Sequence, residues 1–271
     1  MDSDITSRFS GVLRLYGPQA CARLRSAHIA VVGIGGVGSW AVEALARSGV
    51  GRLTLIDLDD ICVTNINRQI HATTQTVGMS KVEVMAERAR AVYPDCHVDA
   101  IGRFFNAHSA HEILSADFSM VMDAIDGAGN KSLLIAECRR RGLAIIVSGS
   151  AGGRVDPTRI RTADLALTTH DRLLADVRRR LRHDHGFPST DDPWGIPAVY
   201  TTELARPPEV EDCVTNNNGA NTTAATARAD RLNCEAGMGS SVCVTGAFGF
   251  AAASLAIAHI VRDGRASPAT P

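Results

Sequence analysis

The chain has 271 residues, 45% of them hydrophobic and 21% charged, which is enough for one large α/β domain or two small ones. A net charge of −1 excludes a globally basic surface for nucleic acid, so a polyanion would have to be held by a local patch. Seven cysteines without a C-x-x-C pair argue against a disulfide scaffold and a four-cysteine zinc site. We therefore expect a reducing, cytoplasmic compartment, no signal peptide and no zinc.

The first 27 residues precede the first expected strand and mix cations with aromatic side chains. Arg8-Phe9 and Arg14-Leu15-Tyr16 are two such groups, and Gln19–Arg25 has the composition of a short helix. Two interpretations stay open: a solvated N-terminal arm, or an arm that lends an arginine to a phosphate site in a partner subunit. Arginine suits the second role because its planar guanidinium binds two phosphate oxygens at once and stays charged.

The segment His28–Asp57 predicts half of a dinucleotide-binding fold. An apolar strand, a glycine-rich turn, a helix, a second apolar strand and an acid follow one another in this segment. The turn satisfies G-x-G-x-x-G with one additional glycine, and its members are Gly33, Gly35, Gly36 and Gly38. These glycines let the backbone turn sharply and approach a phosphate, and the following helix offers free N–H groups to an anion. Asp57 lies 19 residues after Gly38, where its carboxylate can bind a ribose hydroxyl.

Hydrogen-bonding side chains cluster shortly after Asp57, where a nicotinamide enzyme needs little special chemistry. These side chains belong to Asn65, Asn67, Arg68 and Gln69. A helix is expected next, and Ser80 with Glu83 forms the pattern of a capping box at its start. Lys81 then lies at a helix N-terminus, where the dipole disfavours a cation unless an anion is near. Arg68 and Lys81 therefore predict a triphosphate site, the alternative being two surface cations.

Further strands and helices alternate as far as residue 147. The expected ranges are Val98–Phe104, His108–Leu114, Ser119–Ile125, Ser132–Arg141 and Leu143–Val147. This alternation predicts a doubly wound, mostly parallel Rossmann-like α/β sheet with right-handed crossovers. Asp126 follows a central strand that contains Asp123, at the position where a Mg²⁺ ligand stands in an open α/β sheet.

The remaining chain is less regular. Ile160–Leu165 is expected as an edge strand, and His170–His183 as a helix whose arginine run is either a solvated face or a phosphate-contacting patch. Residues 186–235 are rich in proline and asparagine and predict a long functional or mobile loop. We divide the chain into an N-terminal arm (1–27), a nucleotide-binding core (28–165) and a C-terminal extension for substrate and dimer contacts (166–271), all within a single domain.

Ala236–Val261 contains no charged residue and is long enough to span a membrane. Its small residues favour instead a helix buried in the core or at a dimer seam. Ser241, Thr245 and Gly249 recur every fourth residue, which permits close approach of another helix. Cys234, just before this segment, is either an inert thiol or a nucleophile.

The motifs resemble a known family of ATP-using enzymes. The glycine turn, the L-I-D-L-D-D segment with Asp57, the N-x-N-R-Q run, Lys81 and Asp126 are similar to the ATP-binding set of ubiquitin-activating-enzyme-like (ThiF/MoeB) adenylating proteins. Within that superfamily, the segments RFSGVLRLYG, TNINRQIHA, AGGRVDPTRI and GAFGF most resemble the bacterial tRNA threonylcarbamoyladenosine dehydratases. The resemblance implies that Asp57 binds ribose, that Arg68 and Lys81 bind phosphates with support from Asn65 and Gln69, and that Asp126 binds Mg²⁺.

The resemblance also implies an activity: ATP·Mg²⁺ activates the threonyl carboxylate of N6-threonylcarbamoyladenosine in tRNA, and the side chain closes into a ring with loss of water. A homodimer and a sulfur-transfer partner of the cysteine desulfurase system are implied as well. One departure is Gly11, where the arms of sulfur-carrier activators have an arginine, so Arg14 or Arg8 would take that role. Three alternatives remain: adenylation of a carrier protein's C-terminus, which the missing zinc cysteines disfavour; a nicotinamide dehydrogenase; and a nucleotide-bound scaffold.

Overall fold

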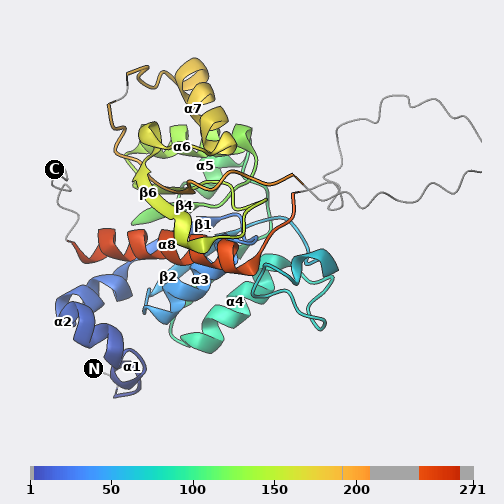
Figure 1. The fold of residues 1–271 in the computed structure, drawn as a ribbon. Coiled ribbons are helices and arrows are strands. Elements are labelled where there is room, and N and C mark those ends of the chain that lie inside the picture. Colours follow the sequence, from blue (N-terminus) through green and yellow to red (C-terminus); the bar gives the residue numbers. More distant parts are fainter. Residues whose placement is uncertain (1–2, 191, 208–237, 263–271) are drawn as a thin grey trace, which may run out of the picture.

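The computed structural model describes residues 3–190, 192–207 and 238–262. A seven-stranded sheet runs through the molecule in the order β3-β2-β1-β4-β5-β7-β6 (Figure 1). Its strands are β1 (His28–Val32), β2 (Arg52–Ile56), β3 (His97–Ile101), β4 (Met120–Asp123), β5 (Ile145–Ser148), β6 (Ile160–Asp164) and β7 (Pro197–Thr201). Neighbouring strands are parallel except β6 and β7, which pair antiparallel at one edge. The prediction of a doubly wound, mostly parallel sheet is confirmed.

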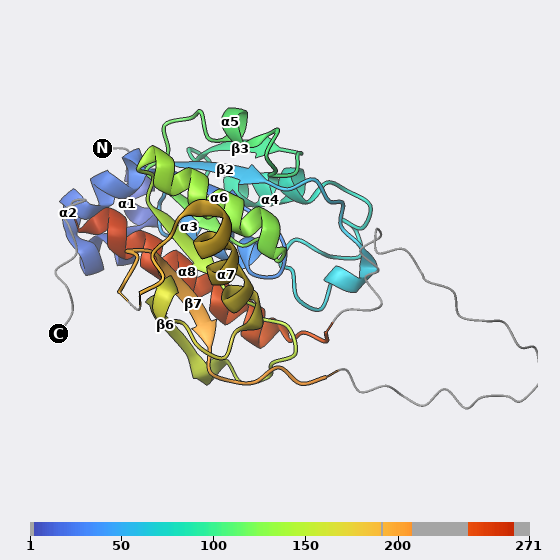
Figure 2. The ribbon, with the colours of Figure 1, turned by 90° about the horizontal axis from the view of Figure 1, so that it is seen from above.

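Helices cover both faces of the sheet. They are α1 (Ser3–Arg8), α2 (Ser10–Ser26), α3 (Gly38–Arg47), α4 (Lys81–Val92), α5 (Ala110–Ile113), α6 (Ala128–Arg141), α7 (Arg172–His185) and α8 (Val242–Val261), with short 3-10 turns at Val63–Asn65, Pro157–Arg159 and Leu165–Leu167. α3, α4 and α8 pack on one face, and α5, α6 and α7 on the other (Figures 1 and 2). Along β1, Ile29 and Val31 enter the first core while Ala30 and Val32 enter the second, as expected of a buried strand.

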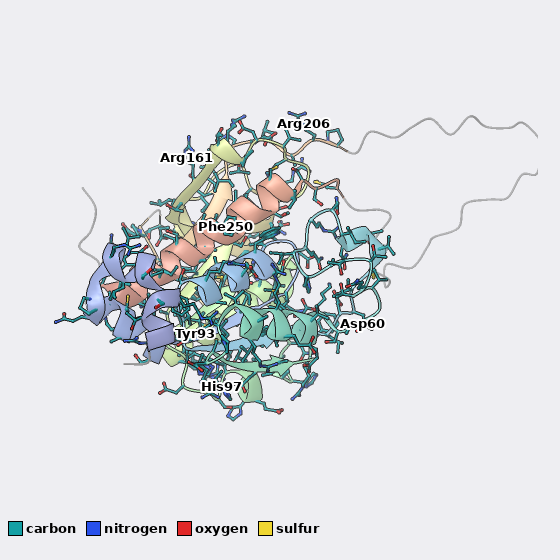
Figure 3. The ribbon with its side chains drawn as sticks, turned by 90° about the horizontal axis from the view of Figure 1, so that it is seen from below. Asp60, Tyr93, His97, Arg161, Arg206 and Phe250 are labelled. Carbon is teal, nitrogen blue, oxygen red and sulfur yellow. The ribbon has the colours of Figure 1, made fainter. Side chains whose placement is uncertain are left out.

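Helix α8 is a core helix packed tightly against α3. A Cβ at Gly249 would lie 2.6 Å from the Val37 carbonyl oxygen and 2.7 Å from the Trp40 Cβ, so the small residue is what allows the contact. By length and hydropathy α8 is the one described helix that could span a membrane, and half of its most apolar window is buried inside the protein. The prediction of a buried small-residue helix is therefore confirmed. Phe250, labelled in Figure 3, stays 49% exposed on the outer side of α8.

The N-terminal segment folds into α1 and α2, with a break at Gly17, where φ is +82°. Phe9 is buried and packs edge-on against Tyr93, with ring centroids 4.8 Å apart. A Cβ at Gly51, which precedes β2, would collide with the Arg25 carbonyl oxygen at 1.8 Å. This part of the arm is thus packed against the amino ends of the strands. It is not the solvated arm that was one of the two interpretations of the sequence.

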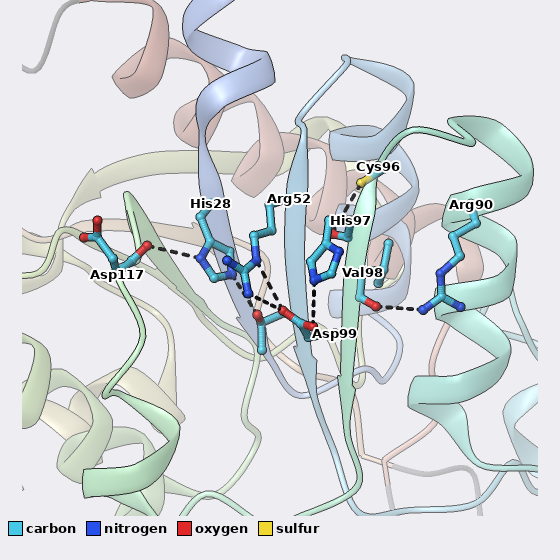
Figure 4. A network of polar contacts seen from close by, with 9 residues as sticks. His28, Arg52, Arg90, Cys96, His97, Val98, Asp99 and Asp117 are labelled. Atoms are coloured by element: carbon cyan, nitrogen blue, oxygen red, sulfur yellow. Dashed lines mark hydrogen bonds and ion pairs between the residues drawn. The ribbon is translucent and has the colours of Figure 1, made fainter.

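A polar network ties together the amino ends of β1, β2 and β3 (Figure 4). The His28 ring lies 2.8 Å from the Thr54 hydroxyl and 3.1 Å from the Asp117 carbonyl oxygen, and burial lowers its pKa. Asp99 accepts hydrogen bonds from Arg52 and lies 3.0 Å from the His97 ring. These polar groups form hydrogen bonds with one another. They lie at the amino edge of the sheet, opposite to the carboxyl edge that carries the glycine turn.

Two element predictions need correction. Helix α6 begins at Ala128, four residues before the predicted Ser132. The region predicted as a loop from residue 186 contains the whole of strand β7, which lies between β5 and β6 in the sheet. Pro197 is the first residue of β7. Proline has no N–H to donate to a neighbouring strand, and the first position of a strand accepts it. Residues 208–237, including Cys234, lie outside the described residues.

Candidate functional site

The glycine turn follows β1 at the carboxyl edge of the sheet and lies against the loop after β4. Gly33 has a φ of +92°, and a Cβ there would lie 2.8 Å from the Ala124 carbonyl oxygen. A Cβ at Gly38 would lie 1.8 Å from the Gly33 carbonyl oxygen. β1 has β2 on one side and β4 on the other, so this is the point where the strand order reverses and where open α/β sheets bind ligands.

The two central glycines of the turn have different surroundings. At Gly35 the nearest atom to a hypothetical Cβ is the Gln69 Nε2, 3.9 Å away, so space for a ligand remains above the backbone. At Gly36 a Cβ would lie 3.1 Å from the Thr245 Cγ2, so this glycine makes room for α8. Helix α3 begins at Gly38 without a side-chain cap. The Ser39 N–H donates to the Gly35 carbonyl oxygen at 3.1 Å, and the other N–H groups of the first turn remain for an anion.

Asp57 joins the end of β2 to the glycine turn. Its Oδ2 accepts a hydrogen bond from the Ile34 N–H at 2.6 Å, and its Oδ1 accepts one from the Asp59 N–H at 2.9 Å. Burial raises the pKa of this carboxyl, while Lys81 and the two backbone N–H groups oppose the rise. The side chain is only half-buried, so a carboxylate edge remains available beside the turn.

The loop after β2 brings Arg68 to the same turn. Its backbone carbonyl oxygen accepts hydrogen bonds from the Trp40 indole at 3.1 Å and from the Thr245 hydroxyl at 3.3 Å. The Arg68 Cγ would lie 3.6 Å from a Cβ at Gly36, and the guanidinium donates to the Thr64 carbonyl oxygen at 2.5 Å. α3 and α8 thus fix the Arg68 backbone next to the turn, while its guanidinium is held by a surface carbonyl that water or a ligand can replace.

Two amide side chains of the loop, Asn65 and Gln69, are buried, whereas Asn67 is exposed and donates to the Ser240 carbonyl oxygen at 3.2 Å. Asn65 Oδ1 accepts the Cys62 N–H at 3.0 Å and so shapes the loop. Gln69 lies over Gly35, and its buried Oε1 has no hydrogen-bond partner in the part of the chain that the structure describes. His71 is 2% exposed, and neither of its ring nitrogens has a partner there either. Burial, Lys81 and Arg88 lower the pKa of His71 to about 4, so the ring is neutral.

Lys81 lies at the start of α4 as predicted, but the chain supplies its anion. Lys81 Nζ lies 2.7 Å from Asp59 Oδ2, and the lysine is buried while the aspartate faces solvent. The unfavourable position at a helix N-terminus therefore does not by itself require a phosphate. Ser80 is the N-cap residue but makes no side-chain cap hydrogen bond, so the predicted capping box does not form. Asp59 was missed although it stands two residues after Asp57.

Asp126 is exposed in the loop between β4 and α6, two residues after the backbone that contacts Gly33. β4 ends at Asp123, so the strand carboxylate lies inside the fold, and Asp126 follows the strand in the exposed part of the loop. Asp123 is fully buried and pairs with Lys131 Nζ at 2.9 Å, an ion pair that the sequence did not reveal. Within the described residues no group of three or more histidine, cysteine or acidic side chains is placed to hold a metal alone, so Asp126 could bind Mg²⁺ only together with phosphate oxygens and water.

Arg14 lies elsewhere in the same chain. It is exposed on α2, and α2 packs beside the residues that precede β2, at the amino edge. Figure 3 shows this separation, with Tyr93 beside the N-terminal helices and Asp60, which follows β2, on another side of the view. Arg8 donates to the Val92 carbonyl oxygen at 3.1 Å, also away from the glycine turn. Neither arginine is brought to the turn of its own chain.

The fold and the glycine turn define a nucleotide-binding protein of the doubly wound α/β class. Residues 8–269 match the ThiF family, and the chain belongs to that family. It is 46% identical over 257 residues to a tRNA threonylcarbamoyladenosine dehydratase of Haemophilus influenzae, covering 94% of each chain. Identity to the protein of that name from Escherichia coli is 45% over 252 residues, covering 92% of each. The solved structure of the E. coli enzyme TcdA with ATP has a TM-score of 0.84 and 40% identity over 97% of both chains, and the one with AMP has a TM-score of 0.85.

Proposed function

We propose that this protein uses ATP to close the side chain of N6-threonylcarbamoyladenosine in tRNA into a ring, with loss of one water. The observation that carries the proposal is the carboxyl edge of the sheet, where Asp57 accepts the Ile34 N–H of the glycine turn, Arg68 lies beside Gly36, and the charge of Lys81 acts on Asp57. The proposal is also supported by similarity over nearly the whole chain to relatives named tRNA threonylcarbamoyladenosine dehydratase, one of which was solved with ATP. A free carboxylate is a poor electrophile, so activation by ATP is what the ring closure requires.

Each residue has a chemical role in this proposal. The turn at Gly35 and the start of α3 receive the phosphates, and Asp57 accepts a ribose hydroxyl. Arg68 and Lys81 leave the Thr64 carbonyl and Asp59 to stabilise negative charge on the phosphates, with Asn65 and Gln69 shaping the loop. Mg²⁺, bound by Asp126 and phosphate oxygens, would neutralise further charge. The ring nucleophile belongs to the substrate, so no nucleophile from the protein is needed.

A homodimer in the cytoplasm is part of the proposal. The outer side of α8 exposes Phe250 and Val242, apolar side chains suited to a seam between two copies. Arg14 lies at the wrong edge of its own chain, so a symmetric partner is how it could reach a nucleotide. A sulfur-transfer partner of the cysteine desulfurase system remains a prediction from the family resemblance.

Adenylation of a carrier protein's C-terminus is the second candidate, because proteins named adenylyltransferase are among the relatives. An adenylyltransferase and sulfurtransferase from Drosophila willistoni is 34% identical, but over only 140 residues. Both activities would use the same turn and cations. Capture of a Gly-Gly tail that depends on ATP would favour the carrier activity.

The direct test is incubation of the purified protein with tRNA that carries threonylcarbamoyladenosine, ATP and Mg²⁺. Digestion and mass spectrometry should then find a nucleoside lighter by one water. A Gly35→Val variant, whose side chain enters the space above the turn, should fold and form no product. An unchanged nucleoside with the wild-type protein refutes the proposal, and NAD binding in place of ATP would indicate a dehydrogenase.

A further inference from the structure

Arginines gather on the two helices α6 and α7, on the sheet face opposite to α8 (Figure 2). We define the arginine track as the solvent-facing side of these helices with Arg139, Arg140, Arg172, Arg179, Arg180 and Arg182. α7 carries five arginines and two aspartates, while the whole chain has a net charge of −1. Positive charge is therefore concentrated here on a molecule that is elsewhere acidic, which is the local patch that a polyanion requires.

The track starts at the edge that holds the nucleotide site. The N-cap of α7, Asp171, accepts the backbone N–H of Ser150 just after β5, so Arg172 lies at the carboxyl edge of the sheet. α6 also begins at that edge, directly after the loop of Asp126. Both helices have 14 residues and run about 20 Å toward the amino edge, which carries the remaining arginines away from the glycine turn.

Aromatic rings fix two of the arginines at the far end of the track. The Arg139 guanidinium lies 4.2 Å from the centre of the Phe187 ring, and that of Arg182 lies 5.4 Å from the Trp194 ring. Phe187 and Trp194 contact each other edge-on at 4.9 Å. Cations held against aromatic faces lose little further side-chain freedom when their N–H groups bind phosphate oxygens. Arg180 is exposed and makes no hydrogen bond or ion pair within the described residues.

We propose that the arginine track binds the phosphate backbone of the tRNA stem next to the modified base. This inference rests on the proposed function for the identity of the RNA. If the modified base binds at the carboxyl edge, the adjoining tRNA stem can lie along α6 and α7. Double-stranded RNA is recognised mainly through its phosphates and 2′-hydroxyls, which arginines can bind. No large hydrophobic side chain is exposed on the described residues of either helix, whereas a protein-docking surface would need apolar or aromatic groups at its centre.

The test compares two double variants that each remove two exposed arginines. Arg139→Gln with Arg180→Gln takes one from each helix of the track. The matched control, Arg47→Gln with Arg90→Gln, takes one each from α3 and α4 on the opposite face. The dissociation constant for tRNA carrying threonylcarbamoyladenosine is measured over a series of salt concentrations, with KM for ATP and thermal unfolding as controls for the nucleotide site and the fold.

The track variant should bind tRNA about tenfold more weakly, and the slope of log affinity against log salt should fall by about 0.7 to 0.9 for each lost phosphate contact. Its KM for ATP should stay unchanged, and the control should bind tRNA like the wild type. Wild-type tRNA affinity in the track variant, or an equal loss in the control, overturns the inference, as does retained tRNA binding with loss of a protein partner. A wild-type protein that binds tRNA through the track but forms no cyclic nucleoside would refute the proposed function alone.

Discussion

Two lysine–aspartate pairs lie at the same edge of the sheet, and they differ in burial. Lys81 and Asp59 are 2.7 Å apart, with the lysine 8% and the aspartate 51% exposed. Lys131 and Asp123 are 2.9 Å apart, and both are completely buried. Water can replace the lysine around Asp59, so Lys81 can turn to another anion at small cost. We call Lys81–Asp59 the open pair and Lys131–Asp123 the closed pair. Separation of the closed pair would leave a buried charge without water, so the role of this pair is structural.

The closed pair fixes the loop between β4 and α6. Asp123 Oδ1 accepts the Ile125 N–H at 3.0 Å, and the Lys131 N–H donates to the Gly127 carbonyl oxygen at 3.0 Å. Both ends of the loop that carries Asp126 are therefore fixed by the paired residues. Burial raises the pKa of Asp123, and Lys131 opposes that rise. Two lysines near one nucleotide site can thus serve different purposes, one in binding and the other in the shape of the loop.

Breaking the closed pair should have the largest effect on stability. Lys131→Met leaves Asp123 buried without a cation and should lower the free energy of unfolding by about 3–5 kcal/mol. Chemical denaturation measures this change. Lys131→Met combined with Asp123→Leu removes both charges and should recover most of the loss. A single variant that loses less than about 1 kcal/mol would contradict the structural role of the pair.

The neutral state of His71 beside the open pair can be tested by pH. The pKa of His71 is lowered to about 4, so between pH 6.5 and 4 the unfolded chain binds a proton that the folded protein excludes. His71 should therefore contribute to stability fully above pH 6.5, and up to about 3 kcal/mol should be lost as the pH falls toward 4. Over this range the free energy of unfolding of the wild type should fall relative to that of His71→Gln. A constant difference between them at all these pH values would show that the histidine does not titrate in this way.

Breaking the open pair should change stability least and activity strongly. Lys81→Met should lower the free energy of unfolding by no more than about 1 kcal/mol, because Asp59 returns to water. Loss of a cation at the phosphates should reduce the rate of cyclic nucleoside formation about 100-fold or more. Denaturation and single-turnover rates measure the two effects. Undiminished activity in this variant would mean that Lys81 serves only Asp59.

The difference between the pairs also shows what the sequence could predict. Spacing gave the glycine turn, Asp57 and the loop of Arg68, because these depend on residues that are close in the chain. It left Lys131 outside the helix predicted from Ser132, and nothing local indicates that this lysine enters the core. The pairing of Lys81 with Asp59 could not be predicted either, since Asp59 is one of three aspartates within four residues and nothing in the sequence distinguishes it. Strand β7 was missed because its pairing with β5 joins residues about fifty positions apart.

The proposed function depends most on whether this protein forms the cyclic nucleoside in tRNA. The most direct measurement is mass spectrometry of tRNA nucleosides from cells that lack the protein, complemented with the wild type, Lys81→Met or the Arg47/Arg90 control. We predict open threonylcarbamoyladenosine without the protein and with Lys81→Met, and the form lighter by one water with the wild type and the control. Cyclic nucleoside at normal abundance in cells without the protein would contradict the account.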